Sequence, residues 1–410
     1  MKLLLLPAYF YPELVSDSPL DDARFHAFAE EGIEMSLYTP MPTRGVDDYQ
    51  KKKYKRIRHE KMFNGMMVVH RFGMFDEGSN PIWRAFRYIL CFIKQLWFGL
   101  NERNIDVIFV ISTPPIQGAL AAFIKNRKKC KFVYNLQDIF PDTLVGAGLA
   151  SKGGALWKIG RMIENYTYRN ADKIIVISQE FKKNIIAKGV SEEKIEIVYN
   201  WVDQEAIHPI DDENNPLFEE LKISRDTFRV VYAGNLGNAQ NLNIIIQAAE
   251  KMRSYYCVEF LIFGKGGLEN DIRKEITTKN LQNVKLLPLQ PYERVSYVYG
   301  LGNVCVVSCK AGLGGSALPS KTWSILSAGR PVIASFDEGE LKTILEENNM
   351  GVFTRAEDVD DFVDTLQILV QSPQKCKEMG EKGRAFILNN LTREVGTSKY
   401  VEIIKDVCSR

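Results

Sequence analysis

The stretch Ala311–Ser335, A-G-L-G-G-S-A-L-P-S-K-T-W-S-I-L-S-A-G-R-P-V-I-A-S, determines our fold prediction for the second half of the chain. An apolar run at Val304–Ser308 precedes it and has the composition of a buried strand. Pro319 or Ser320 is expected to open a helix and Gly329 to close it, since proline and serine suit helix starts and glycine suits helix ends. A strand, a glycine loop and a helix N-terminus together form an arrangement that binds anions through backbone N–H groups.

A lysine stands in the first turn of this expected helix. A cation there opposes the helix dipole by a few tenths of a kcal/mol, unless an anion lies between them. We therefore predict that Lys321 binds a phosphate group. The alternative is a lysine on the exposed surface of the helix.

Length, charge and composition exclude several classes of protein. A chain of 410 residues is too long for one hydrophobic core, so two domains are expected. The net charge of +2 (53 − 51) gives no general attraction to nucleic acid. The seven cysteines never form a C-x-x-C motif, and there are four histidines, so neither a disulfide framework nor a zinc site is expected. We also expect no secretory leader, because the apolar run Lys2–Pro7 is too short for one. No membrane-spanning helix is expected either, because the apolar segment Pro81–Leu100 carries Arg84, Arg87 and Lys94.

Short aliphatic runs alternate with helical patterns along the whole chain, and this alternation predicts parallel, doubly wound sheets. We predict two Rossmann-like α/β domains facing a cleft, at residues 1–205 and 210–390, with the polar stretch Asp203–Glu220 as the linker. A last helix is expected at Arg393–Val407. The expected strands of the first half are Leu3–Leu6, Ile33–Tyr38, Met66–His70, Val107–Ile111, Lys131–Asn135, Ile174–Ile177 and Ile195–Tyr199.

Glycine loops follow several expected strands of the second half. Tyr232–Gly237 (Y-A-G-N-L-G) and Gly264–Gly267 (G-K-G-G) each come at a strand end, where a ligand or tight packing would need glycine. The first strand lacks such a loop, because no glycine follows it until Gly32. This disfavours a nicotinamide or flavin dehydrogenase.

The order of these motifs resembles the donor half of a GT-B glycosyltransferase of family 4. The motifs are Y-A-G-N-L-G, L-I-F-G-K-G, N-V-K-L-L-P-L, L-P-S-K and S-A-G-R-P-V-I. In the first half, S-T-P-P-I-Q-G-A-L-A (112–121), Y-N-L-Q-D-I-F-P-D (134–142) and Y-N-W-V-D (199–203) are similar to the branch that includes bacterial N-acetyl-L-fucosamine transferases. The resemblance implies the GT-B fold, a UDP-sugar donor, retention of anomeric configuration, no essential metal or other cofactor, and a final helix (393–410) that crosses back onto the first domain.

This chain departs from the family pattern around the phosphate-site helix. Ser316 and Ser324 stand where family members have two glutamates, and a serine cannot make a charge-assisted carboxylate contact. Asn235 and Gln240 or Asn241 stand where the family has an arginine and a lysine. Lys321 and the N–H groups of the glycine loop are expected to supply the positive charge that the missing arginine and lysine would give, and Lys310 is a further candidate. The resemblance thus predicts donor contacts from Asn235, Gly237, Gly264, Leu287, Leu289, Ser316, Ser320, Lys321 and Ser324, with Leu287–Leu289 supplying backbone contacts to the base.

Asp138 is the predicted catalytic residue of the first half, together with Lys321 of the second. By resemblance, Asp138 lies near the transferred sugar, and Gln137 stands where the family has a histidine. The alternative is that Asp138 and Asp142 cap a helix or form a turn. No side chain is a convincing covalent nucleophile, which fits a reaction in which the departing phosphate takes the acceptor's proton.

Two segments suggest contact with a membrane surface. Lys51–Lys61 carries seven Lys or Arg residues in eleven (K-K-K-Y-K-R-I-R-H-E-K) and suits anionic lipid. Ile82–Leu100 is expected to form a helix with tryptophans in one apolar arc, typical of an interfacial helix. The alternative, a crossover helix packed on the core beside a solvated charged loop, has equal support from the residues alone. The resemblance favours the membrane, since family acceptors are often polyprenyl-diphosphate-linked sugars.

The sequence therefore predicts a glycosyltransferase that is peripheral on the cytoplasmic face of the cell membrane. It would move a sugar, an N-acetylated deoxyhexosamine, from a UDP-sugar to a lipid-linked saccharide in the biosynthesis of a bacterial surface polysaccharide such as O-antigen or capsule. Two alternatives remain open. One is a degenerate GT-B protein that binds a sugar nucleotide without turnover, and the other is a sugar-nucleotide epimerase, which the scarcity of histidine disfavours.

Overall fold

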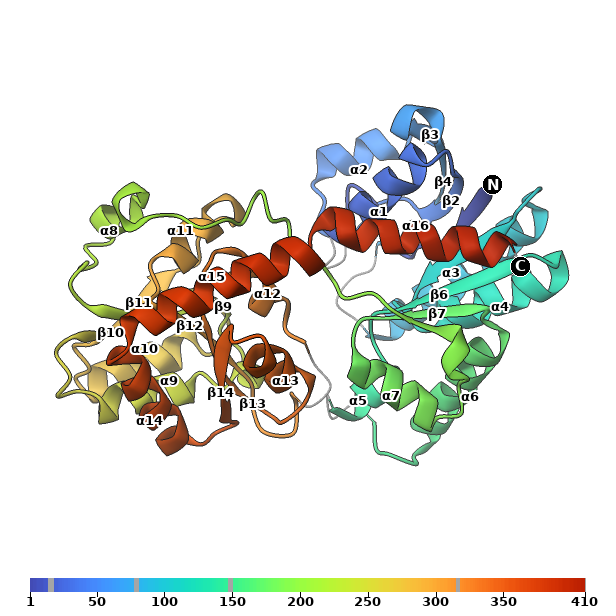
Figure 1. Cartoon of the computed structure of the whole chain (residues 1–410). Coiled ribbons are helices and arrows are strands. Elements are labelled where there is room, and N and C mark those ends of the chain that lie inside the picture. The colour runs from blue at the N-terminus through green and yellow to red at the C-terminus, as the bar shows by residue number, and fades with distance from the viewer. Residues whose placement is uncertain (14–17, 77–80, 147–149, 315–317, 410) are drawn as a thin grey trace. The chain divides into compact units, whose positions relative to one another are not determined.

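The computed structural model describes residues 1–13, 18–76, 81–146, 150–314 and 318–409 (Figure 1). The chain forms two compact units, Met1–Tyr199 with Gly396–Arg410, and Asn200–Val395. Each unit is an α/β domain built on a parallel sheet, which confirms the predicted fold class.

Unit 1 contains an eight-stranded sheet in the order β3-β4-β2-β1-β5-β6-β7-β8. All neighbours are parallel except the edge pair β3–β4. The strands are β1 (Lys2–Leu5), β2 (Glu34–Pro40), β3 (His59–Met62), β4 (Met67–Phe72), β5 (Val107–Ile111), β6 (Lys131–Leu136), β7 (Lys173–Val176) and β8 (Ile195–Ile197). The helices are α1 (Ser18–Glu30), α2 (Asp48–Tyr54), α3 (Pro81–Asn101), α4 (Ile116–Lys128), α5 (Asp142–Gly146), α6 (Ala155–Asn170), α7 (Gln179–Ala187) and α16 (Arg393–Ser409).

The strand order of unit 1 reverses direction at β1, which pairs with β2 on one side and β5 on the other. Right-handed crossovers between parallel strands place α3, α4, α6 and α7 on one face of the sheet. Figure 1 shows α6 and α7 on one side of the β6–β7 region and α16 on the other. Ligands of such sheets bind beyond the carboxyl ends of the strands at the point of reversal.

The last helix belongs to unit 1 from Gly396 onward. Tyr400 is fully buried, and its hydroxyl donates a hydrogen bond to Asn135 Oδ1 at 3.1 Å. The guanidinium carbon of Arg24, on α1, lies 5.0 Å from the centroid of the Tyr400 ring. The contacts of Tyr400 with Asn135 on β6 and Arg24 on α1 thus attach α16 to the sheet and to the first helix of unit 1.

Unit 2 contains a six-stranded parallel sheet in the order β11-β10-β9-β12-β13-β14, which reverses direction between β9 and β12. Its strands are β9 (Phe228–Asn235), β10 (Val258–Lys265), β11 (Val284–Pro288), β12 (Val304–Ser308), β13 (Val332–Phe336) and β14 (Gly351–Arg355). Its helices are α8 (Leu217–Glu220), α9 (Asn243–Lys251), α10 (Glu269–Thr278), α11 (Val295–Gly300), α12 (Ser320–Ser327), α13 (Glu340–Glu347), α14 (Val359–Val370) and α15 (Pro373–Asn390).

Three local expectations were wrong. The stretch Asp203–Glu220 is not a free linker, because it lies in unit 2 and buries Leu217 and Phe218 in α8. After the strand expected near residue 332 the pattern predicts only helices, at about 340–347, 357–370 and 374–389, so the short strand β14 was not predicted. The basic run Lys51–Lys61 is not a simple loop, because it includes most of α2 and part of the edge strand β3.

Candidate functional sites

Lys321 and the end of β9 meet at the point where the sheet of unit 2 reverses direction. Gly234 is the penultimate residue of β9 and has a φ of +148°, a backbone conformation that favours glycine. A Cβ atom added at Gly234 would lie 2.9 Å from Lys321 Nζ. The side chain of Lys321 therefore lies over the backbone at the end of β9. It occupies space that a side chain at position 234 would fill, so glycine is needed there.

The ammonium group of Lys321 is largely shielded from water. Its Nζ donates a hydrogen bond to the hydroxyl of Tyr232 at 3.1 Å and lies 4.3 Å from the centroid of that ring. Desolvation lowers the pKa of Lys321 to about 8, and a smaller charge interaction with Cys309 opposes this shift. In the part of the chain that the structure describes, no carboxylate pairs with Lys321, so the cation lacks a protein counter-charge.

The glycine loop before α12 is partly occupied by a carboxylate of the protein itself. The N–H groups of Gly312 and Gly314 donate to the side chain of Asp337 at 3.0 and 2.8 Å. The expectation that the N–H groups of this loop are free for a phosphate is therefore wrong for these two residues. Asp337 follows β13, and its carboxylate accepts the hydrogen bonds that we expected a phosphate to accept. Ser316 lies outside the described residues.

The other predicted donor residues in this part of the unit lie at the carboxyl ends of β9 and β11 and in the first turns of α12. Asn235 ends β9, and its carbonyl accepts a hydrogen bond from Tyr232 at 2.8 Å, so it shares a hydrogen-bonded chain with Lys321. Ser320 is exposed at the start of α12 and Ser324 is half-buried one turn later. Leu287 lies in the edge strand β11, with the exposed Leu289 just beyond that strand.

The glycines of the donor loops have a packing role that the structure makes explicit. A Cβ atom at Gly264 would lie 2.2 Å from the carbonyl oxygen of Gly234, and one at Gly237 would lie 2.7 Å from Asn235 Nδ2. Gly264 thus allows close approach of β10 to β9, and Gly237 leaves room for the side chain of Asn235 in its own loop. Their contact with a donor stays a prediction.

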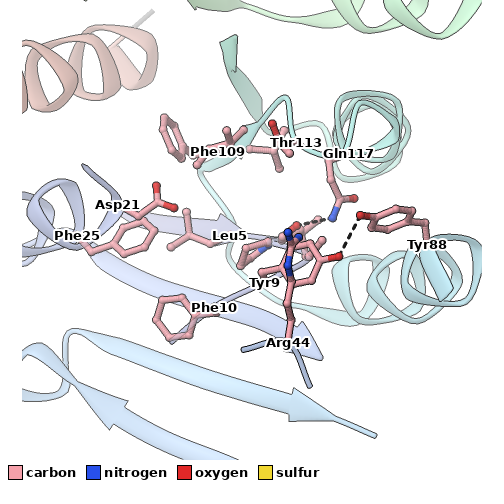
Figure 2. A pocket seen from close by; sticks show the side chains of 15 residues that line it. Leu5, Tyr9, Phe10, Asp21, Phe25, Arg44, Tyr88, Phe109, Thr113 and Gln117 are labelled. Atoms are coloured by element: carbon pink, nitrogen blue, oxygen red, sulfur yellow. Dashed lines mark hydrogen bonds between the residues drawn. The ribbon is translucent and has the colours of Figure 1, made fainter. Parts of the chain in front are cut away.

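Unit 1 has its own pocket, of about 380 Å³, where β1 and β5 end at the reversal of its sheet (Figure 2). The pocket is lined by aromatic rings and a few polar groups. Its lining includes Tyr9, Phe10, Arg44, Tyr88, Thr113 and Gln117. Rings that stack on a ligand and groups that hydrogen-bond to it are the usual means of binding a small polar molecule.

Two polar groups of this pocket have unused binding capacity. Gln117 is 2% exposed and donates from Nε2 to the Leu6 carbonyl and to Gln95 Oε1, both at 2.7 Å. Its Oε1 is buried without a hydrogen-bond partner among the residues that the structure describes, so a ligand hydroxyl that reaches this oxygen could donate to it. The guanidinium carbon of Arg44 lies 5.4 Å from the centroid of the Tyr9 ring, and the side chain is exposed.

The sequence analysis did not identify these pocket residues. Gln117 lies within the motif S-T-P-P-I-Q-G-A-L-A, which was quoted for its resemblance alone. Arg44 lies in an irregular segment, where no pattern of spacing distinguishes it from any surface arginine. Only the folded sheet brings both residues to the same strand ends.

Asp138 is exposed just beyond β6 and is not part of the pocket lining. Its backbone N–H donates to Ser112 Oγ at 3.1 Å, and the N–H of Gln137 donates to the same oxygen at 3.0 Å. Ser112 follows β5, so this hydroxyl ties the ends of two neighbouring strands together. The carboxylate stands at the same edge of the sheet as the pocket, and its catalytic role stays a prediction.

The helix α3 presents its apolar arc to solvent and its polar arc to the domain. Trp83 and Trp97 are 57% and 63% exposed, whereas Arg87 and Gln95 are fully buried. Gln95 Nε2 donates to the carbonyls of Pro7 and Tyr38, both at 2.9 Å. The polar arc therefore binds backbone carbonyls near the strand ends, and the alternative of a core-packed apolar arc holds only in part, because Leu96 packs against the core while both tryptophans face solvent.

No helix in the described ranges is sufficiently long and apolar to cross a bilayer. The same ranges contain no cluster of three or more His, Cys, Asp or Glu side chains arranged to hold a metal ion.

Both halves of the chain match glycosyltransferase family models. Residues 25–206 match "Glycosyltransferase Family 4", and residues 213–386 match "Glycosyl transferases group 1". Among curated proteins, the chain is 26% identical over 343 residues to the putative colanic acid biosynthesis glycosyl transferase WcaI of Escherichia coli, covering 80% of this chain and 82% of that one.

Solved structures of GT-B glycosyltransferases share the whole fold. Sucrose-phosphate synthase from Thermosynechococcus elongatus superimposes with a TM-score of 0.75 at 14% identity, over 100% of this chain and 99% of that one. HepE from Anabaena, solved in complex with UDP, gives a TM-score of 0.71 at 14% identity, over 99% and 100% of the two chains. The chain thus carries the two domains of a GT-B glycosyltransferase; its placement among N-acetylfucosamine transferases stays a prediction.

Proposed function

With both glycosyltransferase domains as the premise, we propose that the protein transfers a sugar from a UDP-sugar to a lipid-linked saccharide in the biosynthesis of a bacterial surface polysaccharide. The observation that carries this proposal is the desolvated Lys321 cation at the strand ends of unit 2, with no carboxylate partner in the described chain. The similarity to WcaI, named for colanic acid biosynthesis, supports the polysaccharide assignment.

The diphosphate of the donor would be bound at Lys321. A buried ammonium group without a counter-charge gains most from a ligand that carries negative charge. The structural neighbour HepE has been solved with UDP and with UDP-glucose, which supports a uridine nucleotide as the donor's leaving group. Asn235, Gly237 and Gly264 would line the diphosphate, Ser316, Ser320 and Ser324 the sugar and ribose, and Leu287 and Leu289 the base.

The acceptor would enter the pocket of unit 1. Its hydroxyl groups would donate to the unpartnered Gln117 Oε1, and a phosphate of the lipid carrier would pair with Arg44. Asp138 would position the acceptor or the transferred sugar. The acceptor class we propose is a polyprenyl-diphosphate-linked sugar, and the transferred sugar an N-acetylated deoxyhexosamine.

The reaction would retain the anomeric configuration and need no metal ion. The acceptor hydroxyl oxygen forms a bond to the anomeric carbon as the bond from that carbon to the UDP oxygen breaks. The proton of the hydroxyl passes to the departing phosphate oxygen on the same face, and UDP leaves. Lys321 stabilises the negative charge that develops on this phosphate, which is the role that a bound metal ion has in other enzymes.

The enzyme would work peripherally on the cytoplasmic face of the cell membrane, where lipid-linked saccharides of this class are extended. The exposed tryptophan arc of α3 and the exposed cations of the basic run Lys51–Lys61 support this location.

Two measurements on the purified protein test the proposal. Calorimetric titration with UDP, GDP and dTDP should give saturable binding for UDP and much weaker binding for the other two. UDP release from a UDP-sugar should then depend on a polyprenyl-diphosphate-linked acceptor. UDP binding without acceptor-dependent release would favour the degenerate GT-B protein that Ser316 and Ser324 suggest, and release of an epimerised UDP-sugar would favour the epimerase.

A further inference from the structure

A second helix of unit 1 also exposes an apolar face. On α6, Leu156, Ile159, Met162 and Tyr166 are 51%, 56%, 70% and 38% exposed. Their spacing of three or four residues places them on one side of the helix. On α3, the exposed residues Trp83, Phe86, Ile89, Ile93 and Trp97 follow the same spacing. These two helices thus hold nearly half of the large apolar side chains exposed in the described chain.

The two faces lie on the same side of the sheet. The helix α4 packs against both α3 and α6 and lies between them. Since the crossovers that contain the three helices connect successive parallel strands, right-handed connection places all three on one face. Rows of exposed apolar side chains on two helices of one face are the pattern expected of a site of contact.

The exposed charges of these helices themselves have one sign. The sequences of α3, α4 and α6 contain a single carboxylate, Glu164. It is 5% exposed, and it accepts hydrogen bonds from Tyr168 at 2.7 Å and Lys188 at 2.9 Å. The exposed charged residues of these helices and of the turn after α4 are cations: Arg127, Lys129, Lys158 and Arg169.

We propose that α3 and α6 form one docking surface that binds an anionic lipid bilayer, with α6 as a second contact of equal importance. Apolar side chains between exposed cations suit the interface, where acyl chains lie beneath anionic headgroups. Tryptophans near both ends of the exposed row on α3 suit the headgroup level, because their rings are apolar and their N–H groups polar. This inference adds a membrane contact to the proposed function and rests on it for its purpose, since a bilayer-bound enzyme meets a lipid-linked acceptor.

Flotation of the full-length protein with vesicles tests the surface without any substrate. We expect binding to phosphatidylcholine vesicles that contain phosphatidylglycerol at about one third of the lipid, and weaker binding to phosphatidylcholine alone. The double variants Ile89→Glu/Ile93→Glu on α3 and Ile159→Glu/Met162→Glu on α6 should each lower the partition coefficient roughly tenfold or more. All four positions are more than half exposed, so the fold should persist.

The matched control is Ile368→Glu/Leu388→Glu in unit 2, which removes two exposed apolar residues and adds the same charge. This variant should bind vesicles nearly as the wild type does. The proposal is overturned if the α6 variant binds like the control, if the control loses as much affinity as the two test variants, or if the wild type ignores anionic vesicles. It is also overturned if light scattering shows a wild-type dimer that both test variants dissociate, since the surface would then join two copies of the chain. UDP titration of the same variants measures donor binding independently of vesicle binding. A failure of the docking surface can therefore be told apart from a failure of the proposed transferase function.

Discussion

Lys321 Nζ lies 3.1 Å from the hydroxyl oxygen of Tyr232 and 4.3 Å from the centroid of the same ring. The tyrosine therefore meets the ammonium group both as a hydrogen-bond acceptor and through its π-face, which attracts a cation. Neither contact neutralises the charge. The tyrosine thus orients a cation that has no carboxylate partner among the described residues. We propose that the donor diphosphate supplies the counter-charge.

Replacing Lys321 by alanine should lower the turnover of the transferase by 10²-fold or more. The reason is the loss of about 3 kcal/mol of stabilisation of the charge that develops on the leaving diphosphate. Initial rates of UDP release measure this effect, and a thermal melt serves as the control for folding. Unchanged turnover in a folded Lys321→Ala protein would remove Lys321 from the mechanism.

The affinity for UDP should fall as the pH rises through about 8. Burial holds the pKa of Lys321 at about 8, below its ordinary value, so the free protein loses this cation above that pH. A bound diphosphate favours the charged lysine, and binding above pH 8 then requires proton uptake. Calorimetry between about pH 7 and pH 9.5 avoids the second ionisation of the phosphate near pH 6.

The control for this pH dependence is Lys321→Arg, because a guanidinium group stays charged throughout the range. Its UDP affinity should change far less over the same interval, even if it is weaker at neutral pH. An equal fall in both proteins would assign the pH dependence to another group.

Gly264→Ala should destabilise the protein, whereas Gly267→Ala should not. The added methyl group at Gly264 would lie 2.2 Å from the carbonyl oxygen of Gly234, and such overpacking costs about 1–3 kcal/mol. At Gly267 an added Cβ would have no neighbour within 4 Å among the described residues, so alanine should be neutral or stabilise by up to about 1 kcal/mol. Chemical denaturation measures both changes. Equal stability of the two variants would contradict the packing role of Gly264.

Arg44→Ala should raise the KM for a diphosphate-linked acceptor by roughly tenfold or more, the value of one charge-assisted contact. Its UDP affinity should not change, since the residue belongs to the pocket of unit 1. The matched control is Arg225→Ala in unit 2, an exposed arginine that also stacks on a ring, that of Phe218. A higher acceptor KM in both variants would indicate a general effect of surface charge instead of a site at Arg44.

Much of the fold was predictable because parallel strands buried on both faces are continuous aliphatic runs, as at Val107–Ile111 and Val304–Ser308. The position of Lys321 was predictable for a similar reason, since Pro319 and Gly329 mark the limits of its helix. The occupant of the glycine loop was not. Asp337 lies more than twenty residues from Gly312 and Gly314 in the sequence, and no local pattern assigns its carboxylate to their N–H groups.

The two parallel α/β domains, the order of the glycosyltransferase motifs and the lysine at the start of α12 follow from the residues alone, because they depend on local periodicity and on residues that begin and end helices. The direction in which α3 faces depends on the folded domain, since the periodicity of this helix defines two arcs but does not say which one packs on the domain. The strand-end carbonyls accept hydrogen bonds from Gln95, and that requirement turns the tryptophans to solvent. The desolvation of Lys321 likewise depends on the folded domain, because burial depends on what the rest of the chain places around a side chain.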